Sequence, residues 1–546
     1  MTIDISITLS AKDERNQNLI RRLAAAELKR QRALPERPDG GADFSLRLLK
    51  RSLDARHGRQ KVHLRLRASI GGTPEAAEPA DGAAQPVWKD ADGRHAVVIV
   101  GAGPAGLFGA LKLLEYGIRP VVVERGAETA ARKRDIAKIS TQGMVDGDSN
   151  YCFGEGGAGT FSDGKLYTRS KKRGSVGAIL SALVRFGADK RILTDAHPHI
   201  GTDRLPLIVN AVREEIIRHG GEFHFRTRCT GFLRNADGRI SGITAERTDG
   251  GGQVEFRGDA VVLASGHSAS DIYRLIAKAA PAALEAKTFA AGVRVEHPRA
   301  LIDSIQYHGR SGGLPAAEYR LAAQVEGRGV YSFCMCPGGF VVPSATGPEE
   351  IVVNGMSAAA RNSNWSNAAI VVETRPEDVP EEFRRKAADA GYPALAGLLF
   401  RTALERETKR RGSGQSAPAQ RLTDFLAEAP SDTLPSASYT PGVVPSRLDQ
   451  WLFPHIARRL SAGFRAFGRN MRGFVCRDAL LIASETRTST PVRILRDGGT
   501  FECAALAGLY PAGEGSGYSG GIVSSALDGQ NVCRAVAEQL LNGAAR

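Results

Sequence analysis

The chain has 546 residues, a formal net charge of +14, 42% hydrophobic residues and 24% charged residues. This length allows about two to four domains with ample cores, and the composition is that of an ordinary globular protein. Because no apolar run approaches the roughly 18 residues of a transmembrane helix and the N-terminus lacks the pattern of a signal peptide, we expect no membrane span and a cytoplasmic location.

The seven cysteines and the uneven charge narrow the function classes further. An odd number of scattered cysteines argues against a disulfide framework. Only Cys334 and Cys336 lie close together, and their C-x-C spacing is typical of neither thiol redox nor zinc sites, so no metal site is predicted. Residues 1–70 hold 16 Lys/Arg and 8 Asp/Glu, a net charge of +8. Without an RNA-binding motif, an ordinary solvated face is favoured over a nucleic-acid surface.

The first 94 residues predict a small basic α/β domain and a linker. A strand is predicted over residues 3–9 and a helix over 13–33. The alternation of Val62, Leu64 and Leu66 with polar residues predicts a half-buried strand. Residues 1–70 therefore form the domain, and residues 71–94, rich in Gly, Pro, Ala and acid, form the linker.

Residues 96–126 predict a strand, a glycine turn, a helix and a second strand. An apolar, β-branched strand over 96–100 precedes the sequence GAGPAG, a helix over 107–116 follows, and a strand over 120–123 ends the unit. A chance glycine turn rarely comes with all of these parts. The unit therefore predicts a binding site for an adenine dinucleotide.

The residues of this unit have separate roles in that prediction. Gly101 permits the tight turn, Gly103 lets the backbone approach a pyrophosphate, and Gly106 lets the helix pack on the strand. The helix N-terminus offers N–H groups to the phosphates, and Glu124 can accept a hydrogen bond from a ribose 2′-hydroxyl. The unit alone does not distinguish FAD from NAD.

The segments that follow favour FAD. The glycine-rich stretch 148–166 suits a loop against a flat or phosphate-bearing ligand, with an ordinary flexible loop as the alternative. After an amphipathic helix over 205–220, three short strands form a predicted β-meander, and a further strand ends at Ser265 and Gly266. This order is that of FAD domains of the glutathione-reductase type, so residues 95–280 are predicted to be the first part of such a domain.

The rest of the chain divides into an insertion and a returning segment. Residues 281–480 lack a nucleotide signature and predict an inserted α+β substrate domain, with helices near 380–427 and 448–467. Residues 481–546 contain a second G-x-G-x-x-G, but the chain ends right after the next helix, so we expect this segment to complete the first domain. The predicted fold class is α/β: a Rossmann-type FAD-binding domain with a β-meander, an inserted α+β substrate domain and a small N-terminal α/β domain.

Several motifs together resemble a family of bacterial FAD-dependent dehydrogenases. They are LLKRSLDAR, GAGPAG, ERG, SNYCFGEGGAGTFSDGKL, ASGHSASD, GVRVEHP, YSFCMCPGG, VNGMS, ETRTSTPVRI and LYPAGEGSGYSGGIVSSALDG, and they cover nearly the whole chain. The resemblance implies FAD and a substrate domain inserted into the FAD domain, and a more distant relation to flavoproteins that reduce enones and polyprenyl C=C bonds. Ser270 stands where the family usually has Arg, so a charge at that position is absent here.

The resemblance also implies a set of cofactor-binding residues. The backbone of Cys229 would meet adenine, the stretch 157–165 would follow the pyrophosphate and the ring, and residues 513–522 would contact ribityl and isoalloxazine. The implied set is Gly101, Gly103, Pro104, Ala105, Gly106, Glu124, Arg125, Gly157, Gly159, Thr160, Ser162, Asp163, Gly164, Lys165, Cys229, Ser265, Gly266, Gly513, Glu514, Gly520, Gly521 and Ile522.

Proton transfer near a flavin ring needs a titratable group. The candidates are His267, Glu296, His297, Tyr331 and Glu514, and a hydrogen-bonded structural role is the alternative for each. Arg294, Glu296 and His297 could form a charged cluster for an acidic substrate or a surface strand with paired charges. Cys336 could be a thiol beside the flavin or, since it lacks a C-x-x-C partner, a packed and unreactive one.

The favoured function is an FAD-dependent oxidoreductase that exchanges a hydride with a small organic substrate at a C–C or C–N bond. With no second complete dinucleotide unit in the sequence, NAD(P)H would bind transiently in the substrate cleft or play no part. The alternatives are a flavin monooxygenase, an RNA-modifying flavoprotein that uses the basic N-terminal module, and a non-catalytic flavin-stabilised scaffold. The oligomeric state is left open.

Overall fold

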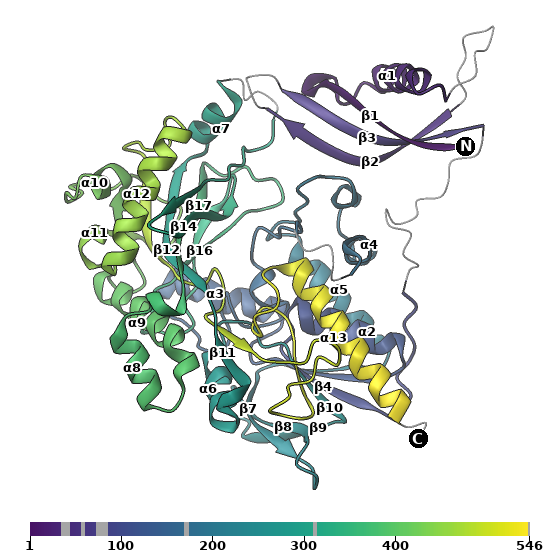
Figure 1. Ribbon diagram of the computed structural model, residues 1–546, viewed down its shortest axis with the longest axis vertical. Coiled ribbons are helices and arrows are strands. Elements are labelled where there is room, and N and C mark those ends of the chain that lie inside the picture. The colour runs from purple at the N-terminus through teal and green to yellow at the C-terminus, as the bar shows by residue number, and fades with distance from the viewer. Residues whose placement is uncertain (34–43, 56–59, 72–85, 169–173, 310–313, 544–546) are drawn as a thin grey trace.

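The computed structural model describes residues 1–33, 44–55, 60–71, 86–168, 174–309 and 314–543. Residues 72–85, which make up most of the expected linker, lie outside this description. The chain forms a small N-terminal unit, a unit built on a parallel sheet and a unit built on a larger, mainly antiparallel sheet (Figure 1).

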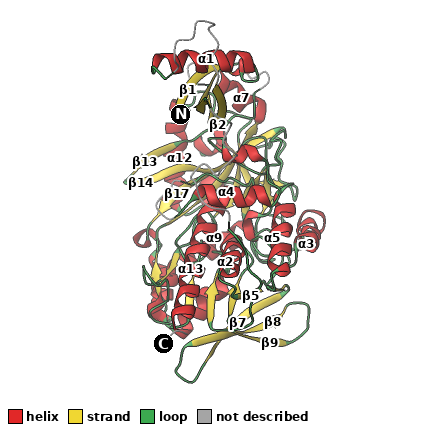
Figure 2. Ribbon diagram, turned by 90° about the vertical axis from the view of Figure 1, so that its right-hand side faces the viewer, coloured by secondary structure: helices red, strands yellow, loops and turns green. Residues whose placement is uncertain are grey.

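The N-terminal unit is a three-stranded antiparallel sheet covered by one helix. The sheet order is β1–β3–β2, with α1 packed over one face, as Figure 2 shows at the upper end of the molecule. Val62, Leu64 and Leu66 of β3 are buried, which confirms the predicted alternation. The helix is shorter than predicted because the Asn16 side chain caps its first turn by accepting a hydrogen bond from Leu19 N. The elements are β1 (Thr2–Ser10), α1 (Gln17–Arg30), β2 (Phe44–Asp54) and β3 (Lys61–Ile70).

One strand of the N-terminal unit touches the body of the protein. Arg51 N donates to Thr194 O at 2.8 Å, and Ala196 N donates to Arg51 O at 2.9 Å. The Arg51 guanidinium also pairs with Asp195 and with Glu14 of its own unit. The basic unit is therefore docked on the body through both backbone and charge.

The second unit is a five-stranded parallel sheet in the order β22–β10–β4–β5–β6. Strands β4 and β5 and the helix α2 between them confirm the elements predicted in residues 96–126. The C-terminal strand β22 and helix α13 begin more than 380 residues after β5 and complete this unit. Figure 1 shows the yellow helix α13 beside α2. The elements are β4 (Ala96–Val100), α2 (Pro104–Glu115), β5 (Arg119–Val123), α5 (Leu205–Arg218), β6 (Glu222–His224), β10 (Ala260–Leu263), β22 (Leu509–Pro511) and α13 (Ile522–Gly543).

Small residues allow α2 and α13 to approach closely. A Cβ atom on Gly109 would lie 2.7 Å from the sulfur of Cys533, and one on Gly529 would lie 2.0 Å from Ala105 O. A larger residue at either position would push the returning helix away from α2. The close packing thus holds the C-terminal segment against the glycine turn of the predicted dinucleotide unit.

Three antiparallel strands in the order β7–β8–β9 lie between strands β6 and β10 of the parallel sheet in the chain. They are β7 (Thr227–Arg234), β8 (Ile240–Arg247) and β9 (Gln253–Arg257). Asp237-Gly238 and Asp249-Gly250 occupy the turns, where both glycines have positive φ.

The third unit is a seven-stranded sheet in the order β13–β14–β17–β12–β20–β18–β19, antiparallel except for its last pair. Phe400, Phe464 and Phe467 from the covering helices pack on Val293 and Ile370 of its central strands. β20 pairs with β12 and continues to Glu485, so this sheet extends past the expected boundary at residue 480. The strands are β12 (Phe289–Pro298), β13 (Ala322–Val325), β14 (Arg328–Cys336), β17 (Trp365–Thr374), β18 (Ala417–Arg421), β19 (Val443–Pro445) and β20 (Leu480–Glu485).

Further elements connect and cover these sheets. Two small two-stranded sheets pair β11 (Leu284–Ala286) with β21 (Val492–Ile494) and β15 (Phe340–Pro343) with β16 (Val353–Met356). The remaining helices are α3 (Thr129–Gln142), α4 (Val176–Arg185), α6 (Ser270–Ala279), α7 (Arg299–Tyr307), α8 (Glu381–Asp389), α9 (Ala396–Arg411), α10 (Leu422–Leu426), α11 (Leu448–Trp451) and α12 (Pro454–Asn470). None of the described helices combines the length and apolar character that crossing a bilayer requires.

Candidate functional site

A cavity of about 360 Å³ lies where the parallel-sheet unit meets the seven-stranded sheet unit. Most of the residues proposed from the sequence as cofactor ligands line it: Gly101, Gly103, Pro104, Ala105, Glu124, Arg125, Gly157, Gly159, Ser162, Asp163, Gly164, Lys165, Cys229, Ser265, Gly266, Glu514, Gly520, Gly521 and Ile522. The structure thus brings together segments that lie up to about 400 positions apart in the chain.

The glycine turn brings bare backbone to the cavity wall. Gly101 has a φ of +107°, and a Cβ atom there would lie 2.5 Å from Ala264 O of the neighbouring strand end. Gly103 is the N-cap of α2 and supplies no side-chain cap, so the first N–H groups of that helix are available to an anion. Gly157 faces Gly103, because a Cβ atom on Gly157 would lie 3.1 Å from Gly103 Cα.

Three further glycines leave parts of the cavity wall without side chains. Cβ atoms on Gly266, Gly520 and Gly521 would meet no protein atom within 4 Å, so these residues border open space. A cavity with this much side-chain-free backbone fits an extended ligand with a pyrophosphate and a flat ring. The residues present therefore fit FAD.

Three residues of the proposed cofactor set do not line this cavity, and their contacts are structural. Gly106 packs on the glycine turn, since a Cβ atom there would lie 2.0 Å from Gly101 O. The Thr160 hydroxyl donates to Glu155 O at 2.9 Å. Gly513 N donates to Asp528 Oδ2 at 2.8 Å, which fixes the loop before α13.

The Glu124 carboxylate at the cavity wall is held by backbone contacts. Its carboxylate accepts hydrogen bonds from the N–H groups of Ala102, Gly126 and Gly154, each at 2.9 Å. Only 5% of the residue is exposed. The carboxylate therefore ties the two glycine-rich segments together, and the contact with a ribose hydroxyl stays a prediction.

The polar end of the glycine-rich loop is held by a buried charge cluster. Asp163 accepts two hydrogen bonds from Arg361, at 2.7 and 3.1 Å, and lies 3.4 Å from Lys165 Nζ. Burial alone would raise the pKa of Asp163, but the charges of Lys165 and Arg361 outweigh it and lower the pKa to about 2. Asp163 is therefore an anion that positions two cations.

Two of the proposed proton-transfer residues meet at the cavity wall. His267 Nδ1 and Glu514 Oε1 are 3.3 Å apart, and both residues line the cavity. The guanidinium of Arg401 donates to His267 O from both terminal nitrogens, each at 3.3 Å, and so fixes the loop that carries the imidazole. This pair can hold a proton next to the space in which a ring would lie.

Glu296 and His297 are part of the protein core and line neither cavity described here. Glu296 is 2% exposed, and its carboxylate accepts from the N–H and the hydroxyl of Ser438. Burial raises the pKa of Glu296 to about 7 and lowers that of His297, which shares a hydrogen bond with Phe474 O, to about 4. Because β12 is a central strand covered on both faces, these residues form neither the substrate-facing charged cluster nor the surface strand that the sequence left open.

A second cavity of about 1070 Å³ adjoins the first and contains the remaining candidate, Tyr331. Burial raises the pKa of Tyr331, so its hydroxyl stays protonated at neutral pH. Arg320 lies at the wall with its guanidinium 5.3 Å from the ring centre of Tyr167. The two cavities share seven lining residues: Lys165, Tyr167, Phe333, Cys334, Gly520, Gly521 and Ile522.

The sequence did not indicate the cluster at this junction. Lys165 Nζ lies 3.8 Å from Cys334 Sγ and 3.9 Å from Cys336 Sγ. Behind it, Arg294 pairs with Glu485 at 3.1 Å, and burial raises the pKa of Glu485 to about 7. The spacing of these residues along the chain gives no signal, because the sheet order brings them together.

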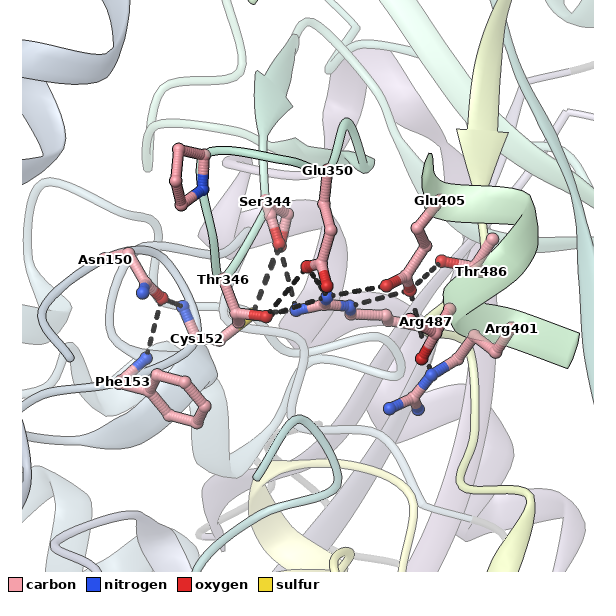
Figure 3. A network of polar contacts seen from close by, with 12 residues as sticks. Asn150, Cys152, Phe153, Ser344, Thr346, Glu350, Arg401, Glu405, Thr486 and Arg487 are labelled. Atoms are coloured by element: carbon pink, nitrogen blue, oxygen red, sulfur yellow. Dashed lines mark hydrogen bonds and ion pairs between the residues drawn. The ribbon is translucent and has the colours of Figure 1, made fainter. Parts of the chain in front are cut away.

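A second group that the sequence did not reveal surrounds Arg487, which lines the first cavity. Figure 3 shows its guanidinium between Glu405 and Glu350 and close to Ser344 and Cys152. Nη2 of Arg487 lies 3.0 Å from each of the two carboxylates. The charges of Arg487 and Arg401 outweigh the burial of Glu405 and lower its pKa. Arg487 therefore connects the glycine-rich loop to the seven-stranded sheet unit.

Comparisons with known proteins identify FAD-related domains in this chain. Residues 94–146 match the family described as FAD binding domain. Residues 288–488 match the family described as FAD-dependent protein, C-terminal domain-like. An uncharacterized protein of Clostridium beijerinckii is 39% identical over 449 residues, which cover 81% of this chain and 80% of that protein.

Solved structures with low similarity include two flavoproteins and a FAD complex. A flavoprotein/dehydrogenase from Cytophaga hutchinsonii is 12% identical, with coverage of 82% of this chain and 79% of that chain and a TM-score of 0.36. The open conformation of a flavocytochrome c3 fumarate reductase is 12% identical, with coverage of 82% of this chain and 78% of that chain and a TM-score of 0.33. CtdE in complex with FAD is 12% identical, with coverage of 82% of this chain and 89% of that chain and a TM-score of 0.32. On the strength of the clostridial relative and the two matched domains, the chain belongs to this family of FAD-dependent proteins and is an FAD-binding flavoprotein.

Proposed function

We propose that the protein is an FAD-dependent oxidoreductase that exchanges a hydride between the flavin and a small organic substrate, at a C–C or C–N bond. The observation that carries this proposal is the junction of the two cavities at Lys165, Cys334 and residues 520–522. A ring held at the end of the first cavity would face a ligand in the second. We further propose that the FAD domain is of the glutathione-reductase type.

When bound, FAD supplies the hydride chemistry, and the chain supplies binding and orientation. The glycine turn and the N-terminus of α2 would hold the pyrophosphate. Gly520, Gly521 and Ile522 lie at the N-terminus of α13 and line both cavities. The positive end of this helix would stabilise negative charge on a ring beside it.

The second cavity would bind and orient the substrate. Its wall combines the rings of Tyr167, Tyr331 and Phe333 with the cationic groups of Lys165 and Arg320. This lining suits an unsaturated or aromatic substrate with an acidic group. His267 and Glu514 would hold the proton that accompanies hydride exchange, at the imidazole nitrogens and the carboxylate.

We also propose where a nicotinamide donor would act. Among the described residues, one parallel sheet carries the complete strand, glycine turn and helix of a dinucleotide unit. NAD(P)H, where it serves as donor, would therefore bind transiently in the second cavity and leave before the substrate enters.

An anaerobic experiment tests this function. The purified protein is mixed separately with NADH, NADPH and a fractionated metabolite extract, while the visible flavin absorbance is followed and products are identified by mass. We expect at least one donor to bleach the flavin and one acceptor to restore its colour. A flavin that no donor reduces, and that stays reduced with every fraction after photoreduction, would contradict the proposal. Hydroxylated products formed only with oxygen would replace it by the monooxygenase alternative.

A further inference from the structure

Cys334 occupies an unusual place at the end of strand β14. The pairing of β14 with β17 shifts register between Phe333 and Cys336. Cys334 itself has a φ of +41°, in the left-handed region that residues with a side chain rarely adopt. The residue is half-buried and lines both cavities, whereas Cys336 is fully buried. The bend therefore separates two neighbouring thiols into an accessible one and an enclosed one.

Cationic groups from two other segments approach this thiol. Lys165 Nζ lies 3.8 Å from Cys334 Sγ, and Arg294 Nη2 donates to Cys334 O at 3.2 Å. Two carboxyl groups lie nearby. Asp163 pairs with Arg361 and lies 3.4 Å from Lys165 Nζ, and Glu485 pairs with Arg294. An ammonium group close to a sulfur in a partly enclosed space favours the thiolate form.

The titration of the two thiols agrees with this geometry. The hydrogen bond from Cys336, followed by the charges of Lys165 and Arg294, lowers the pKa of Cys334 well below its usual range, against burial and Asp163. The interaction with Cys334, together with burial, raises the pKa of Cys336. Burial disfavours the charge of Lys165, but the two sulfurs and Asp163 outweigh it and raise the pKa of Lys165. These directions favour a thiolate at Cys334 beside an ammonium group at Lys165.

We propose that Cys334 and Lys165 form a thiolate–ammonium pair at the junction of the two cavities, and that this pair is a covalent binding site for small electrophiles such as α,β-unsaturated carbonyl compounds. In the reaction, the Sγ electron pair forms a C–S bond with the β-carbon. The π electrons of the C=C bond move to the enolate, which takes one proton from the Lys165 ammonium group. No oxidant or reductant takes part, so the site can act whether or not the flavin turns over.

Alkylation of the FAD-bound full-length protein tests the pair. Iodoacetamide is applied in limited amounts over a range of pH, N-ethylmaleimide serves as the α,β-unsaturated carbonyl probe, and the modified cysteines are identified by peptide mass. We expect Cys334 to react first at pH 6.5, with a rate midpoint at least about one pH unit below that of an ordinary thiol near 8.5. Cys476 is the matched control, because it is half-buried and its pKa is raised by burial.

Variants at position 165 separate the pair from simple accessibility. Lys165→Met should slow the alkylation of Cys334 at pH 6.5 by at least about tenfold, because a neutral neighbour no longer stabilises the thiolate. Lys165→Arg should retain most of the rate. Equal reactivity of Cys334 and Cys476, or an unchanged rate in Lys165→Met, would overturn the proposal.

A measurement on the protein with native Lys165 covers the case in which Lys165→Met does not fold. The ultraviolet absorbance of thiolate is compared between the unsubstituted protein and Cys334→Ser at pH 6.5. We expect a loss of one thiolate in the variant, and equal absorbance would overturn the proposal. These outcomes concern a sulfur and its proton, so they are independent of whether any donor reduces the flavin.

Discussion

The two cavities are built in opposite ways. The cofactor cavity takes most of its wall from short glycine-rich segments whose backbone conformation is set locally, such as the turn at Gly101 and Gly103. The junction with the second cavity depends on side chains of distant segments, such as Lys165, Phe333 and Cys334. The first kind of site is specified by a sequence motif, whereas the second depends on how sheets and loops come together. Perturbing each kind should therefore have different consequences.

The largest effect is expected from removing Arg487, the cation that connects the glycine-rich loop to the seven-stranded sheet unit. Arg487→Met leaves Glu405 and Glu350 without their shared partner, and Glu405 is 1% exposed. We expect a loss of about 3–5 kcal/mol in the free energy of unfolding, measured by urea denaturation. The control is Arg410→Met, since Arg410 of α9 has a side chain that is 68% exposed and pairs with Glu407 at the surface. That variant should lose less than about 1 kcal/mol, and equal losses would argue against a connecting role for Arg487.

A backbone perturbation tests the locally built cavity. Gly101→Ala forces a side chain into a φ of +107° and brings its Cβ to 2.5 Å from Ala264 O. We expect a loss of about 3 kcal/mol in stability and most of the bound FAD, measured as flavin absorbance per protein.

The matched control for this change is Gly238→Ala. Gly238 also has a positive φ, of +83°, but its Cβ would meet no atom within 4 Å. Strain alone should cost about 1 kcal/mol and leave the flavin content unchanged. Full flavin content in Gly101→Ala would show that the close approach of the turn is not required.

The pH dependence of stability should reveal the buried carboxyl group of β12. Burial raises the pKa of Glu296 to about 7 in the folded protein, above its usual 4.5. The folded state therefore binds the proton more tightly, and the contribution of Glu296 is complete below pH 4.5 and is lost as the pH rises towards 7. Unfolding free energies between pH 4.5 and 8 should thus fall by up to about 3 kcal/mol more in the unsubstituted protein than in Glu296→Gln. Parallel pH profiles of the two proteins would contradict this assignment.

The smallest effect is expected when the protein is tested for binding of nucleic acid. In the N-terminal unit Arg65 and Arg67 pair with Asp4, and Arg51 pairs with Glu14 and Asp195, so these three cations are already engaged by carboxylates. We expect the full-length protein not to retard tRNA in a gel at low salt. Retardation that weakens steeply as salt increases would instead favour the RNA-modifying alternative.

The sequence predicted the features that are specified locally, and it did not predict those that depend on tertiary contacts. The strand, turn and helix around GAGPAG are confirmed because periodicity and glycine spacing determine them locally. The use of the Glu124 carboxylate by three backbone N–H groups was not predictable, since Gly154 approaches only after the loop folds back. Neither alternative for Arg294, Glu296 and His297, a substrate-binding cluster or a surface strand, foresaw their burial, because alternation in a strand does not reveal that both sheet faces are covered. The contact of Lys165 with Cys334 likewise depends on tertiary structure.

The proposed function rests on a substrate reaching the flavin through the second cavity, and one measurement tests this most directly. Ala322→Trp places a large side chain on β13 at the wall of that cavity, on an exposed residue that lines the second cavity and not the first. The flavin is photoreduced without oxygen, and its reoxidation by the active metabolite fraction is followed in both proteins. We expect equal FAD content and at least about tenfold slower reoxidation in the variant, a change of about 1.4 kcal/mol in the barrier. Reoxidation at the same rate in both proteins would contradict the assignment of the second cavity as the substrate site.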